Sequence, residues 1–173
     1  MTMMIKNIDS ESLVLKAAQT VWAVNKYFIL ACSQQDYRNI RNCLKPQQLN
    51  LNLAYQLIKK QQLRFQSVPG HLLPEIENTL YHIAGYFKNN LKSNQKAALN
   101  ELIKQDAAEA FRLLEQYTID FHVNYLLQSN IWNSNRWKTF NIVNTTLKEK
   151  NSVYKPGELF WYGDYCKAKI PPS

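Results

Sequence analysis

The chain has 173 residues, 46% of them hydrophobic, which is the length of about one domain and enough apolar content for a core of its own. Only four glycines are present, so a fold of short strands and tight turns is disfavoured and a helical one is favoured. The 21 basic and 13 acidic residues give a formal charge of +8, which favours anionic partners such as nucleic acid or an acidic protein surface.

The three cysteines, Cys32, Cys43 and Cys166, are odd in number and form no C-x-x-C pair, so neither a disulfide framework nor a zinc site is indicated. The apolar run Phe28 to Cys32 is far shorter than the roughly 20 residues that span a bilayer. The N-terminus lacks the basic start and apolar stretch of a signal peptide. We therefore expect a cytoplasmic protein that binds no membrane and uses no cofactor or metal.

The first predicted helix begins near Asp9 or Ser10 and runs to Ala31 with apolar residues over much of its circumference, which is typical of a central helix. A second helix is predicted from Gln34 to Leu44, because Ser33 and Asp36 form a capping-box pattern and Pro46 stops the helix. A third is predicted from Asn50 to Gln66. Its expected apolar contacts are Leu53, Leu57, Leu63 and Phe65.

A fourth helix is predicted from Pro74 to Leu91, with one apolar and one polar face. The apolar face carries Ile76, Leu80, Ile83, Phe87 and Leu91, and the polar face Glu75, Asn78, His82, Gly85, Asn89 and Lys92. The run from Asn94 to Leu127 divides into two helices, because Asp106 and Glu109 form a second capping-box pattern. Ala110, Leu114, Tyr117, Phe121 and Tyr125 form its predicted buried stripe.

A further helix is predicted over residues 136–149, followed by a tail rich in aromatic residues. The overall prediction is an all-α, single-domain helical bundle of about six to seven helices. The domain is residues 1–173, with its helical core at about 10–148 and the irregular C-terminal tail, 149–173, packed on it.

A glycine and a histidine in the middle of the polar face of the fourth helix indicate a ligand niche. Gly85 would let a ligand approach the backbone, beside His82 and Tyr86. The alternative is a tight helix crossing at Gly85, with His82 and Tyr86 as interior hydrogen-bonding groups. A metal site is disfavoured because no histidine or carboxylate lies three or four positions after His82.

Basic residues are concentrated between Tyr37 and Asn100. This segment contains nine basic residues and only two acidic ones. Such a region suits phosphate contacts, and solvated helix faces are the alternative. The residues expected to bind nucleic acid or another anion are Arg38, Arg41, Lys45, Lys88 and Lys92.

Two segments resemble the YbgA family of small bacterial proteins. Residues 26–41 match its K-x-x-x-L-A-x-S-x-x-x-Y-R pattern, which includes Tyr37, and residues 82–93 match H-x-x-G-Y-F-x-x-x-L-x-S. The family is also found fused behind a domain related to tRNA thiouridine desulfidases. The resemblance implies a tRNA-recognition or helper module. The predicted ligand niche comprises His82, Gly85, Tyr86 and Tyr37.

The chain departs from this pattern at two places. Trp22 and Val24 stand where family members carry a histidine and an arginine, and the segment from Gln105 to Gln116 lacks the glycine and proline of the family. Any role of those groups is therefore lost or altered here.

The sequence thus favours a non-catalytic binding module that recognises RNA, with tRNA as the expected ligand. One alternative is a protein-interaction or scaffold subunit that uses the aromatic tail from Tyr154 to Tyr165. Another is an enzyme built around His82. The sequence does not specify an oligomeric state.

Overall fold

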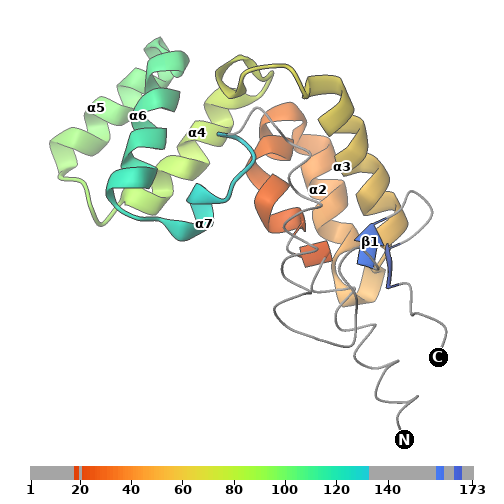
Figure 1. The fold of residues 1–173 in the computed structure, drawn as a ribbon. Helices are drawn as coiled ribbons and strands as arrows, with labels where there is room; N and C mark the ends of the chain where they lie inside the picture. Colours follow the sequence, from red (N-terminus) through yellow and green to blue (C-terminus); the bar gives the residue numbers. More distant parts are fainter. Residues whose placement is uncertain (1–17, 20, 133–158, 162–165, 169–173) are drawn as a thin grey trace, which may run out of the picture.

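Helices make up nearly all of the fold in the part of the chain that the structure describes (Figure 1). The structure is a computed structural model that describes residues 18–19, 21–132, 159–161 and 166–168. The predicted all-α class is confirmed. A helix over residues 21–32 is followed by α2 (Gln34–Cys43), η1 (Pro46–Gln48), α3 (Leu51–Phe65), η2 (Gly70–Leu72), α4 (Ile76–Ala84), η3 (Gly85–Phe87), α5 (Ser93–Gln105), α6 (Ala107–Asp120) and α7 (Asn124–Leu127). Two short strands, β1 (Leu159–Trp161) and β2 (Cys166–Ala168), pair antiparallel.

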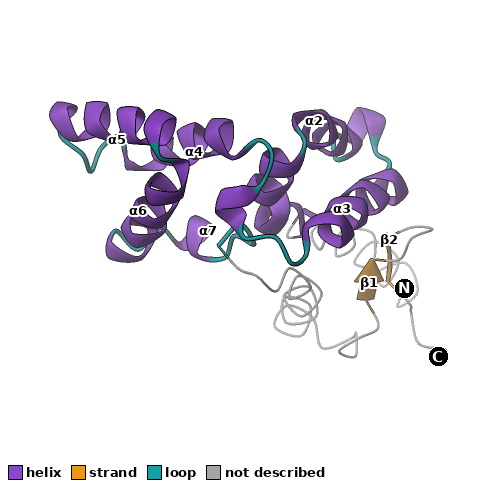
Figure 2. Cartoon of the chain, turned by 90° about the horizontal axis from the view of Figure 1, so that it is seen from above, coloured by secondary structure: helices purple, strands orange, loops and turns teal. Residues whose placement is uncertain are grey.

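The helices form two groups that share one hydrophobic core. In one group α2 packs against α3, and in the other α4, α5 and α6 pack against one another. Figure 2 shows α5 and α3 toward opposite ends of the helical body, with α7 between them. Backbone hydrogen bonds from Glu75 to Ala31 and from Asn130 to Val24 connect the helix over residues 21–32 to later parts of the chain.

The helix over residues 21–32 is central, as its apolar circumference predicts. Five consecutive residues, Tyr27 to Ala31, are all buried, which requires neighbours on every side of the helix. The apolar face predicted for the fourth helix is also confirmed, because Ile76, Leu80, Ile83, Phe87 and Leu91 are all buried.

The predicted helix boundaries at residues 33 and 106 are confirmed by their caps. The Ser33 hydroxyl accepts a hydrogen bond from the Asp36 N–H at 3.1 Å, and the Asp106 carboxylate accepts one from the Glu109 N–H at 3.0 Å. Both bonds satisfy N–H groups that a helix start leaves without an intrahelical partner.

The predicted apolar face of α3 is wrong at two positions. Leu53 and Leu63 are 40% and 54% exposed. The inward face instead carries Ala54, Tyr55, Ile58, Gln61 and Gln62. The helix accepts two buried glutamines because polar side chains on neighbouring helices pair with them, as described below.

Two predicted helices end earlier than expected. The fourth begins at Ile76 rather than Pro74 and gives way at Gly85 to the tighter turn of η3. Likewise α6 ends at Asp120, because His122 adopts a positive φ of 51° that a helix cannot contain. The predicted buried stripe is therefore wrong beyond Tyr117, since Phe121 and Tyr125 are 38% and 40% exposed.

Several predictions fall on residues outside the described part. These are the start of the first helix, the helix over residues 136–149, and most of the tail from 149 to 173, on which the scaffold alternative depends. Within the described residues, no helix has the length and apolar character needed to cross a membrane.

Candidate functional site

Three tyrosines from distant parts of the chain meet at one place, and we call them the tyrosine cluster: Tyr27, Tyr86 and Tyr125. The Tyr27 hydroxyl donates a hydrogen bond to the Tyr86 hydroxyl at 2.8 Å. The rings of Tyr86 and Tyr125 are nearly parallel, with an interplanar angle of 13° and centroids 6.1 Å apart. The Tyr27 ring meets both of them edge-on. Tyr27 is buried, whereas Tyr86 is 38% exposed, so the cluster presents two accessible rings on a buried support.

The ends of α4 and α6 position the exposed rings of Tyr86 and Tyr125. Tyr86 lies in η3, directly after Gly85, where the chain leaves the regular helix α4. Tyr125 lies in α7, and the turn at His122 separates it from the buried stripe of α6. The residues that end the helices therefore turn Tyr125 from a predicted core position into part of a surface.

Positive charge lies beside the tyrosine cluster. The Lys26 Nζ is 5.3 Å from the centroid of the Tyr27 ring, a distance at which a cation is attracted to an aromatic face. Burial lowers the pKa of Lys26, and the nearby positive charge of Arg41 lowers it further. We call Lys26 and Arg41 the cationic pair. A lysine and an arginine at this edge of the cluster favour anions as ligands.

Tyr37 joins the cationic pair to the tyrosine cluster. Burial raises its pKa, the positive charge of Arg41 opposes that rise, and the neighbouring Tyr86 adds to it. Its ring also contacts Trp22, with centroids 5.3 Å apart. The structure thus brings together Tyr37 and Tyr86, which belong to one predicted niche.

Three phenols of this site, Tyr27, Tyr37 and Tyr125, have a raised pKa and stay protonated at neutral pH. Burial raises the pKa of Tyr27, and the hydrogen bond to Tyr86 raises it further. Burial raises the pKa of Tyr125 as well. The surface consequently offers neutral ring faces and hydroxyl groups next to positive charge. This chemistry suits binding better than proton transfer near pH 7.

The environment of Gly85 contradicts the alternative of a tight helix crossing. A Cβ added at Gly85 would meet no atom within 4 Å, so no helix crosses tightly there. His82 is exposed, which also excludes the interior role weighed for it. Its side chain forms no ion pair or hydrogen bond with any residue of the described ranges, so none of those residues orients it as a catalytic base would require.

The five predicted anion-binding residues are all exposed. Arg41 acts electrostatically on Lys26 and Tyr37, so its positive charge reaches the edge of the tyrosine cluster. Arg38 lines a separate pocket, with its guanidinium 3.4 Å from the Gln34 side-chain oxygen. Lys45 follows α2, whereas Lys88 and Lys92 lie between η3 and α5, and none of these three forms an ion pair within the described residues.

Sequence reasoning missed two buried polar networks beside this site. The Asn25 side-chain oxygen accepts hydrogen bonds from Gln62 and Asn130, each at 3.0 Å. The Asp36 carboxylate accepts one from Gln61 at 2.5 Å and pairs with Lys60 at 3.4 Å. The sequence identifies Asp36 only as a capping residue, and no local pattern indicates that its carboxylate bonds to α3.

A metal centre finds no support in the part of the chain that is described. No three histidine, cysteine, aspartate or glutamate side chains gather there as metal ligands would.

Comparison with known proteins assigns the family. Residues 26–134 match the model of DUF1722, a family described as proteins of unknown function. The chain belongs to the DUF1722 family. No curated protein and no solved structure matches it. The DUF1722 region contains the tyrosine cluster, the cationic pair and Tyr37, so the whole candidate site lies within the part that defines the family.

Proposed function

We propose that this DUF1722 protein is a non-catalytic module that binds RNA, with tRNA as its ligand, through the tyrosine cluster and the cationic pair. The observation that carries the proposal is the pair of exposed, nearly parallel rings of Tyr86 and Tyr125 beside the charges of Lys26 and Arg41. Exposed aromatic rings next to cations are the combination that binds single-stranded nucleic acid.

Each part of the site supplies one component of RNA recognition. An unpaired base that stacks on an aromatic side chain contributes about 1–3 kcal/mol. Phosphate contacts by lysine and arginine add affinity that falls as salt rises. The protonated phenols can donate hydrogen bonds to base edges or to the ribose 2′-hydroxyl, which specific recognition of RNA loops requires. The unpaired bases of tRNA loops present all three partners.

The finer resemblance to the YbgA family supports tRNA over other RNAs. Both segments that carry the resemblance contribute to the site, the first through Lys26 and Tyr37 and the second through Gly85 and Tyr86. In that family the same module is also fused behind domains related to tRNA thiouridine desulfidases. Trp22, one of the departures, adds a further aromatic ring against Tyr37.

Fluorescence anisotropy with labelled tRNA at increasing salt tests the proposal. We expect Tyr125→Ala to weaken binding about tenfold, because the stacking energy of one base corresponds to that factor. Tyr125→Phe keeps the ring and is the matched control, since Tyr125 uses its ring in every contact described here. Arg41→Gln should weaken binding and reduce its salt dependence, whereas Arg112→Gln, on α6 and paired with Glu109, should not. Absence of tRNA binding at low salt would refute the proposal.

A further inference from the structure

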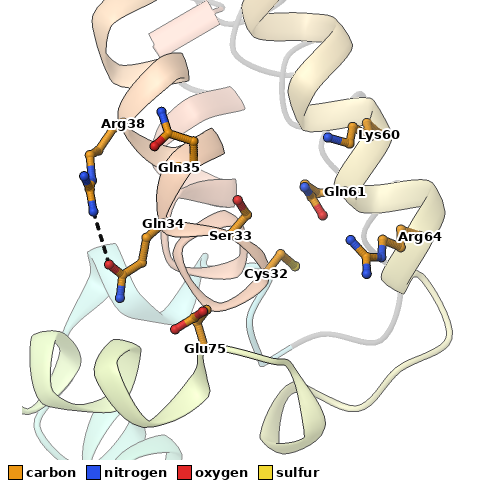
Figure 3. A pocket seen from close by; sticks show the side chains of 9 residues that line it. All are labelled: Cys32, Ser33, Gln34, Gln35, Arg38, Lys60, Gln61, Arg64 and Glu75. Atoms are coloured by element: carbon orange, nitrogen blue, oxygen red, sulfur yellow. Dashed lines mark hydrogen bonds between the residues drawn. The ribbon is translucent and has the colours of Figure 1, made fainter.

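A polar pocket of about 470 Å³ lies between α2, α3 and the start of α4 (Figure 3). Its volume is in the range of small-molecule sites. The start of α2 contributes Ser33, α2 also provides Arg38, α3 provides Lys60, Gln61 and Arg64, and Glu75 precedes α4. Nearly all of these side chains are polar or charged, so the pocket suits a hydrophilic ligand.

The charges of this pocket favour a doubly negative ligand. Three cationic side chains and one carboxylate line it. Neither Arg38, which donates a hydrogen bond to Gln34, nor Arg64 forms an ion pair with another described residue, whereas Lys60 pairs with Asp36. The positive end of the α2 dipole adds to the attraction, because the first residues of that helix line the same pocket. A phosphate dianion matches a net positive lining beside a helix start better than a single carboxylate does.

The side-chain oxygen of Gln61, a buried hydrogen-bond acceptor at the pocket, indicates that the ligand also carries a hydrogen-bond donor. Gln61 is 1% exposed, its Nε2 donates to Asp36, and its Oε1 has no hydrogen-bond partner among the residues that the structure describes. In Figure 3 the oxygen end of this side chain points toward the gap beside Arg64. A buried acceptor without a partner is costly, so a ligand that donates a hydrogen bond to it gains affinity. A phosphate dianion has no proton to donate, so the donor belongs to another part of the ligand.

We propose that this pocket binds a small phosphate monoester that carries hydroxyl groups, with the phosphate at Arg64 and the start of α2 and a hydroxyl at Gln61. A sugar phosphate has this chemistry and a fitting size. Glu75 can accept a second hydroxyl of the same ligand. This inference goes beyond RNA binding at the tyrosine cluster and does not depend on it.

Isothermal titration calorimetry of the full chain with ribose 5-phosphate, inorganic phosphate and ribose tests this proposal. We expect one molecule of ribose 5-phosphate to bind per chain, inorganic phosphate to bind more weakly, and ribose to give no heat. Arg64→Gln should weaken ribose 5-phosphate binding at least about tenfold, and the matched control Arg112→Gln should leave it unchanged. No heat with millimolar ribose 5-phosphate, or an equal loss in both variants, would overturn the proposal.

Gln61→Leu separates the acceptor from the charges. We expect it to weaken ribose 5-phosphate binding while leaving inorganic phosphate binding unchanged, because only the sugar reaches Gln61. A melting curve confirms that the variant is folded, and Arg64→Gln remains decisive if it is not. Binding of a ribotrinucleotide, measured with and without a 5′-phosphate, distinguishes two sources of the phosphate monoester. Preference for the phosphorylated strand assigns the pocket to an RNA end, and equal binding assigns it to a free metabolite.

Discussion

The hydroxyl of Tyr27 donates a hydrogen bond to the hydroxyl of Tyr86, 59 positions later in the chain, at a distance of 2.8 Å. This bond joins the central helix to η3 and holds Tyr86 where its ring lies parallel to that of Tyr125. It also connects the two sequence segments that resemble one family. The site is therefore built on the core itself, since Tyr27 belongs to the buried cluster.

The raised pKa of Tyr27 predicts a loss of stability at alkaline pH. Its phenol ionises near pH 10 in the unfolded chain but at higher pH in the folded protein. Above pH 10 the unfolded state therefore binds fewer protons, and the free energy of unfolding falls as pH rises. One proton corresponds to about 1.4 kcal/mol per pH unit. Urea unfolding of the wild type at pH values between 8 and about 11 measures this slope.

Tyr27→Phe is the comparison for that slope. Lys26 acts in the opposite sense, because its lowered pKa adds stability as pH rises toward its unfolded value. Both proteins contain Lys26, so the difference between their slopes isolates the phenol. We expect the variant to be less stable at pH 8, since the bond to Tyr86 is lost, and to decline less steeply above pH 10. Parallel slopes would mean that Tyr27 titrates as in the unfolded chain.

Asp36 in α2 should contribute far more to the free energy of unfolding than Glu109, which occupies the same position in α6. Asp36 and Glu109 both lie three residues after a helix cap, so their interactions with the helix dipole are similar. Asp36 is buried and pairs with Gln61 and Lys60, whereas Glu109 pairs with Arg112 at the surface. We expect Asp36→Ala to lower the free energy of unfolding by about 2–3 kcal/mol and Glu109→Ala by less than about 1 kcal/mol. Chemical denaturation of both variants measures the difference.

Asn25 should be essential for joining the ends of the described helical region. Its side-chain oxygen accepts from Gln62 on α3 and from Asn130, 105 positions away. Asn25→Ala removes the acceptor that both amides use, at an expected cost of about 1–3 kcal/mol in the free energy of unfolding. Gln35→Ala is the control, because Gln35 donates an equally long bond to Asn39 on the exposed side of α2. A similar, small loss in both variants would contradict a structural role for the buried network.

Local patterns predict the elements of this fold well and their inward faces less well. Ser33 and Asp106 mark two helix starts because a cap bonds only to its own first turn. The face of α3 is misassigned because Gln61 and Gln62 look like surface residues until their partners, Asp36 and Asn25, are known. Burial of such a polar side chain depends on a residue elsewhere in the chain, which periodicity does not contain.

Local sequence patterns also predict only part of the candidate site. The apolar and polar faces of the fourth helix follow from spacing, and they place Gly85 and His82 outward as observed. Tyr27 and Tyr125 were missed because each also fits a run of core residues. Only the turn at His122 and the tertiary bond to Tyr86 show that Tyr125 is exposed and that Tyr27 supports the same site, beside Lys26.

Gly85 provides a direct test of the niche, because a methyl group there should affect the fold and the ligand differently. Its backbone is in the ordinary helical region, with φ of −58°, and an added Cβ would meet only open space. Gly85→Ala should therefore leave the free energy of unfolding unchanged or raise it by up to about 1 kcal/mol. If RNA approaches the backbone beside Tyr86, the same methyl group obstructs it and weakens tRNA binding severalfold. Ala84→Gly, one position earlier, is the control that alters helix propensity without adding a group. Unchanged tRNA affinity in a stable Gly85→Ala variant would show that the ligand does not come close to this glycine.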